Sequence, residues 1–228
     1  MLEILYLDEH LVAINKPHGL LVHRSQIAAD ATEFAVQMLR NQLDRHVFPV
    51  HRLDRKTSGV LLFALSAESL SATRKIFEER NIKKSYRAIV RGFAPEKLTI
   101  DYPLKNDRGK LQEAITNIEL IQKVELAVPF GRHETSRYSL VSLTPVTGRM
   151  HQLRKHMAHI FHPIIGDRPH GCNKQNRLFL EKWNVTQMML HSNNLTFVHP
   201  YFKTPISIDA PIRPEFVHCL NLLGFDMV

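Results

Sequence analysis

The feature that most constrains the fold is an uninterrupted apolar run, residues 60–65, that directly follows a polar turn, residues 51–59. A short run without a polar position, entered from a turn with Gly59, predicts a buried strand. The turn holds one acid, Asp54, among three basic residues, and nearby positive charge favours the ionised carboxylate. Loops at the ends of rigid strands often carry function. The turn is therefore a candidate site, with a surface salt-bridge cluster as the alternative.

The charge of the chain indicates a polyanionic partner. Its 30 Lys and Arg residues exceed 22 Asp and Glu residues, which gives a net charge of +8. Such an excess favours nucleic acid. Two cysteines exclude a disulfide framework and fit a reducing compartment. The first ten residues lack the pattern of a signal peptide, and no apolar run approaches the ~20 residues of a membrane helix. We expect a cytoplasmic protein without a membrane partner.

Local periodicity predicts an α+β chain. Apolar residues recur at helical spacing in four segments: 32–45, 68–80, 148–161 and 214–223. Short apolar or alternating runs predict nine strands: 3–7, 11–16, 59–65, 84–92, 98–104, 114–124, 137–144, 188–198 and 206–209. Few helices among many strands argue against a regular parallel architecture, so a mainly antiparallel sheet is expected. No linker or repeat marks a boundary, and we expect a single domain over residues 1–228.

Three stretches are dense in basic and hydroxyl side chains: residues 51–59, 84–92 and 145–156. Together they favour an RNA enzyme. Arg and Lys would neutralise phosphates, His151 and Gln152 would hydrogen-bond sugar or base edges, and the Tyr86 ring would stack on a base. The alternative for Tyr86 is a place in the core, where a tyrosine is ordinarily found.

A metal site is the other hypothesis that the histidines raise. His151, His156, His159 and His162 crowd one region, and two pairs among them have the three-residue spacing of one helix face. No acidic residue lies on the predicted helix, and no zinc-protease motif occurs. We therefore expect no metal and assign these histidines to RNA contacts or to the surface.

The three stretches resemble, in order, the three signature motifs of the pseudouridine synthases, in the branch typified by ribosomal large-subunit synthase A. Residues 15–20, 162–167 and 190–191 resemble further elements of that branch. The resemblance implies the pseudouridine synthase fold, with a mixed, mainly antiparallel central sheet flanked by helices and loops and a central active-site cleft. It also implies one catalytic domain without an additional N-terminal RNA-binding domain, no cofactor, and a monomer.

The resemblance also assigns roles to individual residues. Asp54 matches the essential aspartate, which acts either as a nucleophile on the base or sugar or as a base at C2′ of the sugar. Arg154 matches the basic partner that orients Asp54, and Tyr86 matches the tyrosine that stacks on the uracil. Arg52 matches a position that fills the space left by a flipped base. Leu190 matches an apolar residue of the pocket.

Further polar residues of the three motifs are expected to contact the substrate RNA: His51, Thr57, Lys84, Arg149, His151 and Gln152.

The substrate is expected to be tRNA. Five flanking segments look most like those of a tRNA-modifying member of the branch, which implies uridine 65 in the T-stem: residues 2–10, 22–25, 46–48, 101–104 and 159–171. Residues 105–114 are shorter than in some relatives, and this leaves the substrate less defined than the chemistry. Alternatives are ribosomal RNA as substrate, a non-catalytic RNA-binding module, and a metal-dependent ribonuclease, which a chelator would inhibit.

Overall fold

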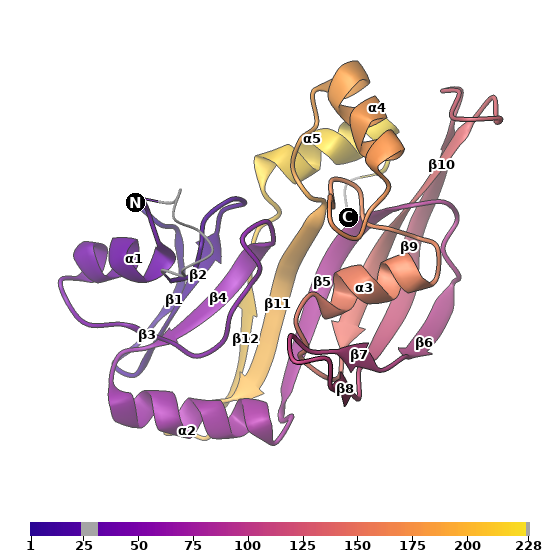
Figure 1. Cartoon of the computed structure of the whole chain (residues 1–228). Coiled ribbons are helices and arrows are strands. Elements are labelled where there is room, and N and C mark those ends of the chain that lie inside the picture. The colour runs from indigo at the N-terminus through magenta and orange to yellow at the C-terminus, as the bar shows by residue number, and fades with distance from the viewer. Residues whose placement is uncertain (24–31, 227–228) are drawn as a thin grey trace. The chain divides into compact units, whose positions relative to one another are not determined.

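The computed structural model describes residues 1–23 and 32–226. This part of the chain forms five helices and twelve strands with a central, mostly antiparallel sheet, so the predicted α+β class is confirmed (Figure 1). None of these helices is long and apolar enough to cross a membrane. Arg24 and Ser25, part of a segment that supported the tRNA prediction, lie outside the described residues.

The chain divides into two compact units. Unit 1 comprises Met1–Lys84 and Ser192–Ile212, and unit 2 comprises Ser85–His191 and Arg213–Val228. Each unit therefore combines two stretches that are separate in the sequence. The single catalytic domain over residues 1–228 stays a prediction.

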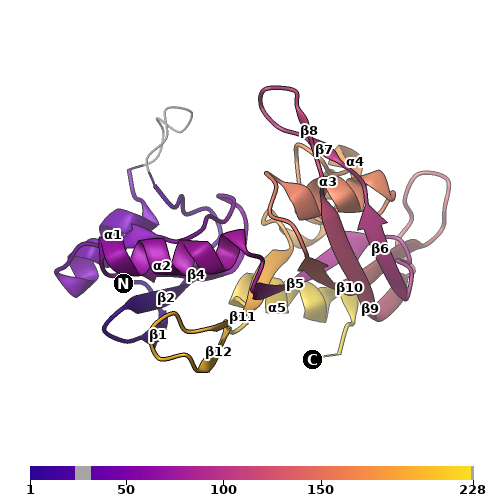
Figure 2. The same ribbon diagram turned by 90° about the horizontal axis from the view of Figure 1, so that it is seen from below.

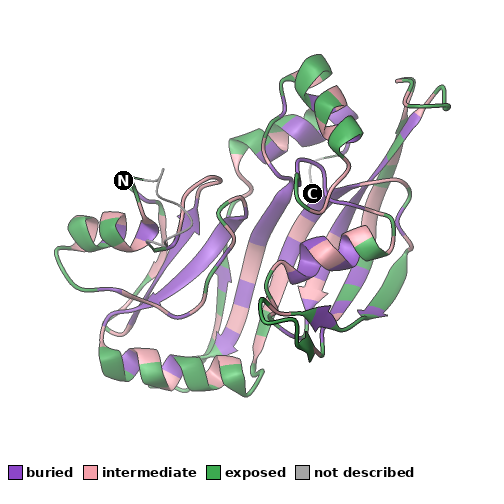
Figure 3. Cartoon of the chain, viewed as in Figure 1, coloured by how far each residue is buried: buried purple, intermediate pink, exposed green. Residues whose placement is uncertain are grey.

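Unit 1 is built on β4 (Ser58–Ala64), which corresponds to the apolar run of the sequence. Every residue of β4 is buried (Figure 3). The antiparallel pairing of β4 with β2 runs from Leu11 opposite Ala64 to Lys16 opposite Gly59. A Cβ atom on Gly59 would lie 2.1 Å from the carbonyl oxygen of Ser192, and φ there is +106°, so only glycine fits. The elements of this unit are β1 (Ile4–Leu7), β2 (Leu11–Lys16), α1 (Ala35–Leu43), β3 (Phe48–Pro49), β4 (Ser58–Ala64), α2 (Ala67–Glu78), most of β11 (Leu190–Val198) and β12 (Pro205–Asp209).

Helix α2 covers the core of unit 1. Leu70, Ile76 and Phe77 pack against the buried side chains of the strands, as their spacing predicts. The side chain of Ser66 accepts the backbone N–H of Ser69 at 3.1 Å and so caps the N-terminus of the helix. Burial of one large apolar side chain contributes roughly 1.5–3 kcal/mol. These contacts hold α2 on the strands that lead to and from the Asp54 turn.

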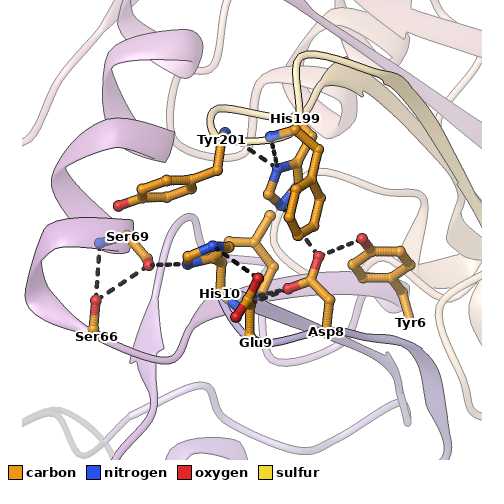
Figure 4. Close-up of polar contacts among 10 residues, drawn as sticks. Tyr6, Asp8, Glu9, His10, Ser66, Ser69, His199 and Tyr201 are labelled. Atoms are coloured by element: carbon orange, nitrogen blue, oxygen red, sulfur yellow. Dashed lines mark hydrogen bonds and ion pairs between the residues drawn. The ribbon is translucent and has the colours of Figure 1, made fainter.

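Asp8 lies in the loop between β1 and β2, and its carboxylate accepts several hydrogen bonds (Figure 4). Its Oδ1 accepts the backbone N–H groups of His10 and Leu11, each at 2.7 Å. Its Oδ2 accepts the hydroxyl of Tyr6 and lies 3.1 Å from Nε2 of His199. Burial by itself would raise the pKa of Asp8, but these hydrogen bonds outweigh it and the net shift is downward. The carboxylate therefore stays ionised at neutral pH.

His199 is the buried partner of Asp8 at the turn between β11 and β12. Its Nδ1 accepts the backbone N–H groups of Tyr201 and Phe202 at 3.2 and 3.1 Å, so its own N–H is on Nε2, which faces Asp8. The ring stacks on Phe202, and the ring of His10 stacks on Tyr201. Burial lowers the pKa of His199. The pair thus joins an ionised acid to a neutral imidazole.

Unit 2 is built on antiparallel strands of the central sheet, with helices on both sides. Strand β10 pairs with β5 on one edge and β9 on the other, with Leu143 opposite Tyr86. Helices α3 and α5 lie on opposite sides of these strands (Figure 2). The elements are most of β5 (Ile82–Arg91), β6 (Lys97–Asp101), β7 (Leu104–Lys105), β8 (Leu111–Gln112), β9 (Ile115–Leu126), β10 (Ser136–Pro145), α3 (Gln152–His159), α4 (Asn173–Trp183) and α5 (Pro214–Leu223).

Helix α4 was not predicted from the sequence, and neither were the two-residue strands β3 and β8. Its buried residues are Gln175 and Phe179, one turn apart. The Gln175 side chain donates to the hydroxyl of Tyr138 at 2.6 Å, and Phe179 packs edge-on against the same ring. Because one of the two buried positions is polar, the helix lacks the apolar stripe by which amphipathic helices are detected.

The two cysteines of the chain lie in unit 2 and differ in environment. Cys172 precedes α4 as its N-cap residue and is partly exposed. Cys219 is buried on α5, and burial raises the pKa of its thiol to about 12.

Candidate active site

The Asp54 turn connects β3 to β4 in unit 1. The backbone N–H of Thr57 donates to the carbonyl of Asp54 at 3.1 Å, which closes the turn before the chain enters the buried strand. Leu53 and Thr57 are buried on either side, whereas the Asp54 side chain is half-buried. Arg52 is exposed, so it is available to RNA from this turn. Local packing thus presents the acid on a fixed backbone.

Lys16 lies beneath this turn and was missed as a site residue. Its side chain is fully buried, and the ammonium donates to the carbonyls of Pro17, Leu20 and Arg55 at 3.0, 2.8 and 3.1 Å. Burial lowers the pKa of Lys16 to about 7, and the charge of Asp54 opposes this shift. The Lys16 side chain therefore connects the loop after β2 to the Asp54 turn by hydrogen bonds, and it places an amine close to Asp54.

The sequence does contain a sign of this role. Lys16 is the last residue of β2, a strand in which all six residues are buried. A proline follows Lys16 in the sequence. A lysine that continues a buried strand needs acceptors for its ammonium. The acceptors are backbone carbonyls of the two loops, which no side-chain motif reveals.

Two further predicted contact residues of unit 1 pack against one ring. Nε2 of His51 accepts the backbone N–H of Leu62 at 3.1 Å, and the imidazole stacks on Phe77. Burial lowers the pKa of His51 to about 3, and the charge of Lys84 adds to the effect. The Lys84 ammonium lies 5.9 Å from the centre of the Phe77 ring. These contacts favour a structural role for His51, and its contact with RNA stays a prediction.

Unit 2 contributes Tyr86 and Leu190 on strands. Tyr86 lies on β5 and is 9% exposed, so its alternative place in the core and its role against a base are compatible. Leu190 begins β11 and is buried, as a pocket residue or a core residue would be. The convergence of Tyr86 and Arg154 with Asp54 of unit 1 stays a prediction.

The segment before α3 is organised by Gln152. Its Oε1 accepts the hydroxyl of Thr147 and the backbone N–H of Arg149, at 2.7 and 3.0 Å. Its Nε2 donates to the carbonyl of Ile115 and the hydroxyl of Thr116, at 2.9 and 3.0 Å. All hydrogen-bonding groups of this buried amide are thereby used within the protein, which favours a structural role over an RNA contact. The network also explains why α3 begins later than the predicted helix.

Arg149 and His151 flank this amide. Nε of Arg149 donates to the carbonyl of Glu113 at 2.9 Å. His151 precedes α3 in a left-handed conformation, with φ of +55°, and its Nδ1 lies 2.9 Å from Nε2 of His170. Both side chains are partly exposed, so their contacts with RNA remain predictions.

Arg154 has a buried partner that the sequence did not predict. Its Nε and Nη2 donate to Oδ2 and Oδ1 of Asp167, both at 2.8 Å. The exposed fractions of the two side chains are 6% and 1%. Burial would raise the pKa of Asp167, but the guanidinium of Arg154 outweighs it and the net shift is downward. The pair is a forked, fully charged contact inside unit 2.

The histidines considered for a metal site have protein partners instead. The two ring nitrogens of His156 lie 3.0 Å from the Thr116 hydroxyl and from the carbonyl of Tyr102. His159 stacks on the Tyr102 ring, and Nδ1 of His162 lies 2.9 Å from the carbonyl of Arg91. Across residues 1–23 and 32–226, no group of three or more His, Cys, Asp or Glu residues is arranged to hold a metal ion.

Comparison with known proteins gives consistent results. The sequence model described as RNA pseudouridylate synthase matches residues 10–159. The tRNA pseudouridine synthase C of Haemophilus influenzae is 48% identical over 239 residues, with both chains fully covered. The Vibrio cholerae protein of the same name is 48% identical over 236 residues, covering 99% of this chain and 97% of its own.

Two solved human proteins have similar structures. RNA pseudouridylate synthase domain containing 4 superposes with a TM-score of 0.75 at 26% identity, covering 99% of this chain and 94% of its own. RNA pseudouridylate synthase domain containing 1 gives a TM-score of 0.74 at 24% identity, covering 95% and 86%. At 24% identity, the similarity to the second protein shows a shared fold only.

Proposed function

Because the chain belongs to the RNA pseudouridylate synthase family, we propose that it converts a uridine of tRNA to pseudouridine, and that the target is uridine 65 in the T-stem. It is an isomerase of the pseudouridine synthase type. We also propose that it falls in the branch typified by ribosomal large-subunit synthase A and acts as a monomer in the cytoplasm.

One observation carries the choice of tRNA. Relatives that match this chain over nearly its whole length, at 45–48% identity, are named tRNA pseudouridine synthase C. The net charge of +8 supports a substrate rich in phosphate. A uridine in a stem has to leave its stack to be modified, and unstacking costs a few kcal/mol. Modification of ribosomal RNA is the alternative.

The proposed reaction is balanced without a cofactor. The bond between N1 of uracil and C1′ of ribose breaks, the base turns, and C5 bonds to C1′. C5 loses its proton and N1 gains one, so substrate and product have the same atoms and the same oxidation state. The protein has to bind and flip the uridine, hold the base while it turns, and remove one proton.

Three residues take the central roles in this proposal. The Asp54 carboxylate acts either as a nucleophile or as a base at C2′, and in both cases it has to be ionised. The buried Lys16 beneath the turn holds the backbone beside Asp54 through its hydrogen bond to the carbonyl of Arg55. Tyr86 stacks on the uracil, and Arg154 orients Asp54. Arg52 is proposed to occupy the space that the flipped base leaves.

Mapping of pseudouridine tests the substrate. The gene is deleted in its host, and pseudouridine in all tRNA and ribosomal RNA is located by carbodiimide treatment and primer extension. Loss at uridine 65 of tRNA is expected. Loss only in ribosomal RNA would replace the substrate and leave the reaction class in place.

Substitution of Asp54 tests the chemistry. Asp54→Asn is expected to abolish tritium release from C5-labelled uridine and to change RNA affinity less than about tenfold, because one carboxylate contributes little to binding a polyanion. Asp44→Asn is the matched control, since Asp44 is exposed at the left-handed C-cap of α1, where asparagine fits well. Normal turnover by Asp54→Asn would remove Asp54 from the mechanism. Strand cleavage that stops with a chelator would indicate a metal-dependent ribonuclease instead.

A further inference from the structure

We propose that Asp167 is a positioning residue for the isomerisation: its carboxylate fixes the guanidinium of Arg154, and the side chain of Asn176 on α4 fixes the turn that carries Asp167. This inference rests on the proposed function, in which Arg154 orients Asp54. Asp167, Asn176 and α4 were not among the site residues expected from the sequence, and all the contacts that support the proposal lie within unit 2.

The first step of the argument is the two-point contact. A guanidinium is planar, so two parallel hydrogen bonds to one carboxylate fix its plane as well as its position. The contact uses Nε and Nη2 of Arg154, both at 2.8 Å from Asp167. It therefore also sets the direction in which the remaining amino group, Nη1, donates. A single hydrogen bond would leave the group free to rotate.

The second step is burial. The two side chains are almost completely removed from solvent. A buried guanidinium cannot lose its proton, so it needs a compensating charge. The pKa of Asp167 is shifted downward despite its burial, through Arg154 first and then His170. The carboxylate therefore provides that charge throughout the neutral pH range.

The third step is the fixation of Asp167 itself. Asn176 reaches from α4 to both sides of one peptide segment: its Oδ1 accepts the N–H of Gly166 at 2.9 Å, and its Nδ2 donates to the carbonyl of Asp167 at 2.8 Å. A Cβ atom on Gly171 would lie 1.9 Å from that same carbonyl oxygen, and one on Gly166 would lie 1.9 Å from the carbonyl oxygen of Gln187. The turn is thus closely packed on two sides, and its carboxylate has a fixed place.

This arrangement gives α4 a function. The helix contributes a tyrosine contact to the core through Gln175, and on its next residue it presents Asn176 to the turn. A fixed cation matters most where charge must be placed accurately, and a misplacement of about 1 Å can lower a rate by about 10²-fold. Asp167 then acts through Arg154 and has no contact with the substrate.

The test separates kcat from KM. Tritium release from C5-labelled uridine in a tRNA transcript is measured for Asp167→Asn, Arg154→Ala and the double variant. Asp167→Asn is expected to lower kcat by about 10²-fold and to leave KM within about threefold, because the guanidinium loses its orientation and the RNA surface is unchanged. In the Arg154→Ala background, Asp167→Asn is expected to have no further effect on kcat, since its route of action is gone.

Glu125→Gln is the matched control. It makes the same carboxylate-to-amide change at an exposed contact with Arg137, 3.2 Å long, in the same unit. Its kcat and KM are expected to equal those of the wild type. Asn176→Ala provides a second variant that keeps both charged groups, and its kcat is expected to fall about tenfold at unchanged KM.

The outcomes distinguish the inference from the proposed function. A wild-type kcat in Asp167→Asn, with Arg154→Ala inactive, overturns the role of Asp167 and leaves that of Arg154 intact. A wild-type kcat in Arg154→Ala overturns the proposed role of Arg154 and, with it, that of Asp167. An effect on KM alone overturns positioning in favour of binding. If Asp167→Asn does not fold, a wild-type kcat in Asn176→Ala overturns the proposal.

Discussion

Asp167 in unit 2 and Asp8 in unit 1 each contact a buried side chain that carries a nitrogen base, and the two contacts differ in kind. In unit 2, Asp167 and Arg154 make two parallel hydrogen bonds, and both side chains are buried. In unit 1, Asp8 lies 3.1 Å from one nitrogen of His199 and also accepts a tyrosine hydroxyl and two backbone N–H groups. One carboxylate depends on a cation, and the other depends on several neutral donors.

The difference shows what each contact is suited for. The cation of Arg154 cannot titrate, so its contact keeps one geometry over the whole working range of pH. His199 is neutral because burial lowers its pKa. The fold weakens when this buried ring is forced to take a proton, because Nδ1 then can no longer accept the backbone N–H groups of Tyr201 and Phe202. We expect loss of the Arg154–Asp167 contact to lower the free energy of unfolding more than loss of the Asp8–His199 contact. We expect only the contribution of His199 to decrease in mild acid.

Removal of the cation is expected to have the largest effect on stability. Arg154→Met leaves the buried carboxylate of Asp167 without its charge partner, and the free energy of unfolding is expected to fall by about 3–5 kcal/mol. Urea unfolding at neutral pH measures this value. The double variant Arg154→Met/Asp167→Leu is expected to regain most of the loss, since it removes the bare charge as well. Equal stability of the single and double variants would show that the charge pair is not the source of the loss.

Removal of one histidine nitrogen is expected to have an intermediate effect. In His199→Asn the amide oxygen takes the place of Nδ1 and can still accept the backbone N–H groups of Tyr201 and Phe202, whereas the contact with Asp8 is lost. The expected loss is about 1–3 kcal/mol, the usual cost of removing one partner from a buried polar group. The same urea experiment measures it. A loss as large as that of Arg154→Met would contradict the distinction between the two contacts.

The pH dependence is expected to be the smallest effect. The unfolded chain binds a proton at His199 near the ordinary pKa of about 6.5, and the folded chain binds it only at lower pH, so stability falls as the pH drops below about 6.5. Asp8 and Glu9 oppose the lowered pKa of His199, and His10 adds to it. The lowered pKa values of Asp8 and Asp167 make stability depend on pH only below about pH 4, where the carboxylates of the unfolded chain take up protons.

A comparison of variants isolates the histidine. Unfolding free energies are measured at about pH 7 and about pH 5.5, where one group contributes at most about 1.4 kcal/mol per pH unit. His199→Asn is expected to lose less stability over this interval than the wild type, because the group whose folded and unfolded pKa values differ has been removed. An identical loss in His199→Asn and the wild type would exclude His199 as the sensitive group.

Most of the fold could be predicted because apolar periodicity determines it. The predicted bounds of β2 and α5 agree with the structure at both ends, and those of β4 differ by one residue. The buried positions of these elements are mostly occupied by apolar residues, so the spacing of apolar residues in the sequence predicts where each element lies. Helix α4 was missed because a buried glutamine takes the place of an apolar residue, and α3 begins late because Gln152 caps the preceding loop.

The candidate site could be predicted only in part. Asp54, Tyr86 and Arg154 were identified through motifs, and their roles in the reaction stay predictions. Lys16 and Asp167 could not be identified from motifs alone, because their importance depends on burial and on partners far along the chain. The partner of Asp167 is thirteen residues away, and the farthest partner of Lys16 is thirty-nine residues away. A short sequence motif does not show which residues far along the chain are in contact, or which side chains are buried.

The contrast between the two cysteines makes the chain convenient for spectroscopy. At neutral pH the buried thiol of Cys219, with its pKa raised to about 12, supplies almost no thiolate for alkylation, while Cys172 is partly exposed where α4 begins. A maleimide dye therefore attaches preferentially beside the turn that holds Asp167. The sequence thus accepts a fluorescent reporter at this place without any engineered residue, and the emission of that reporter is expected to respond to changes in the local order of the turn.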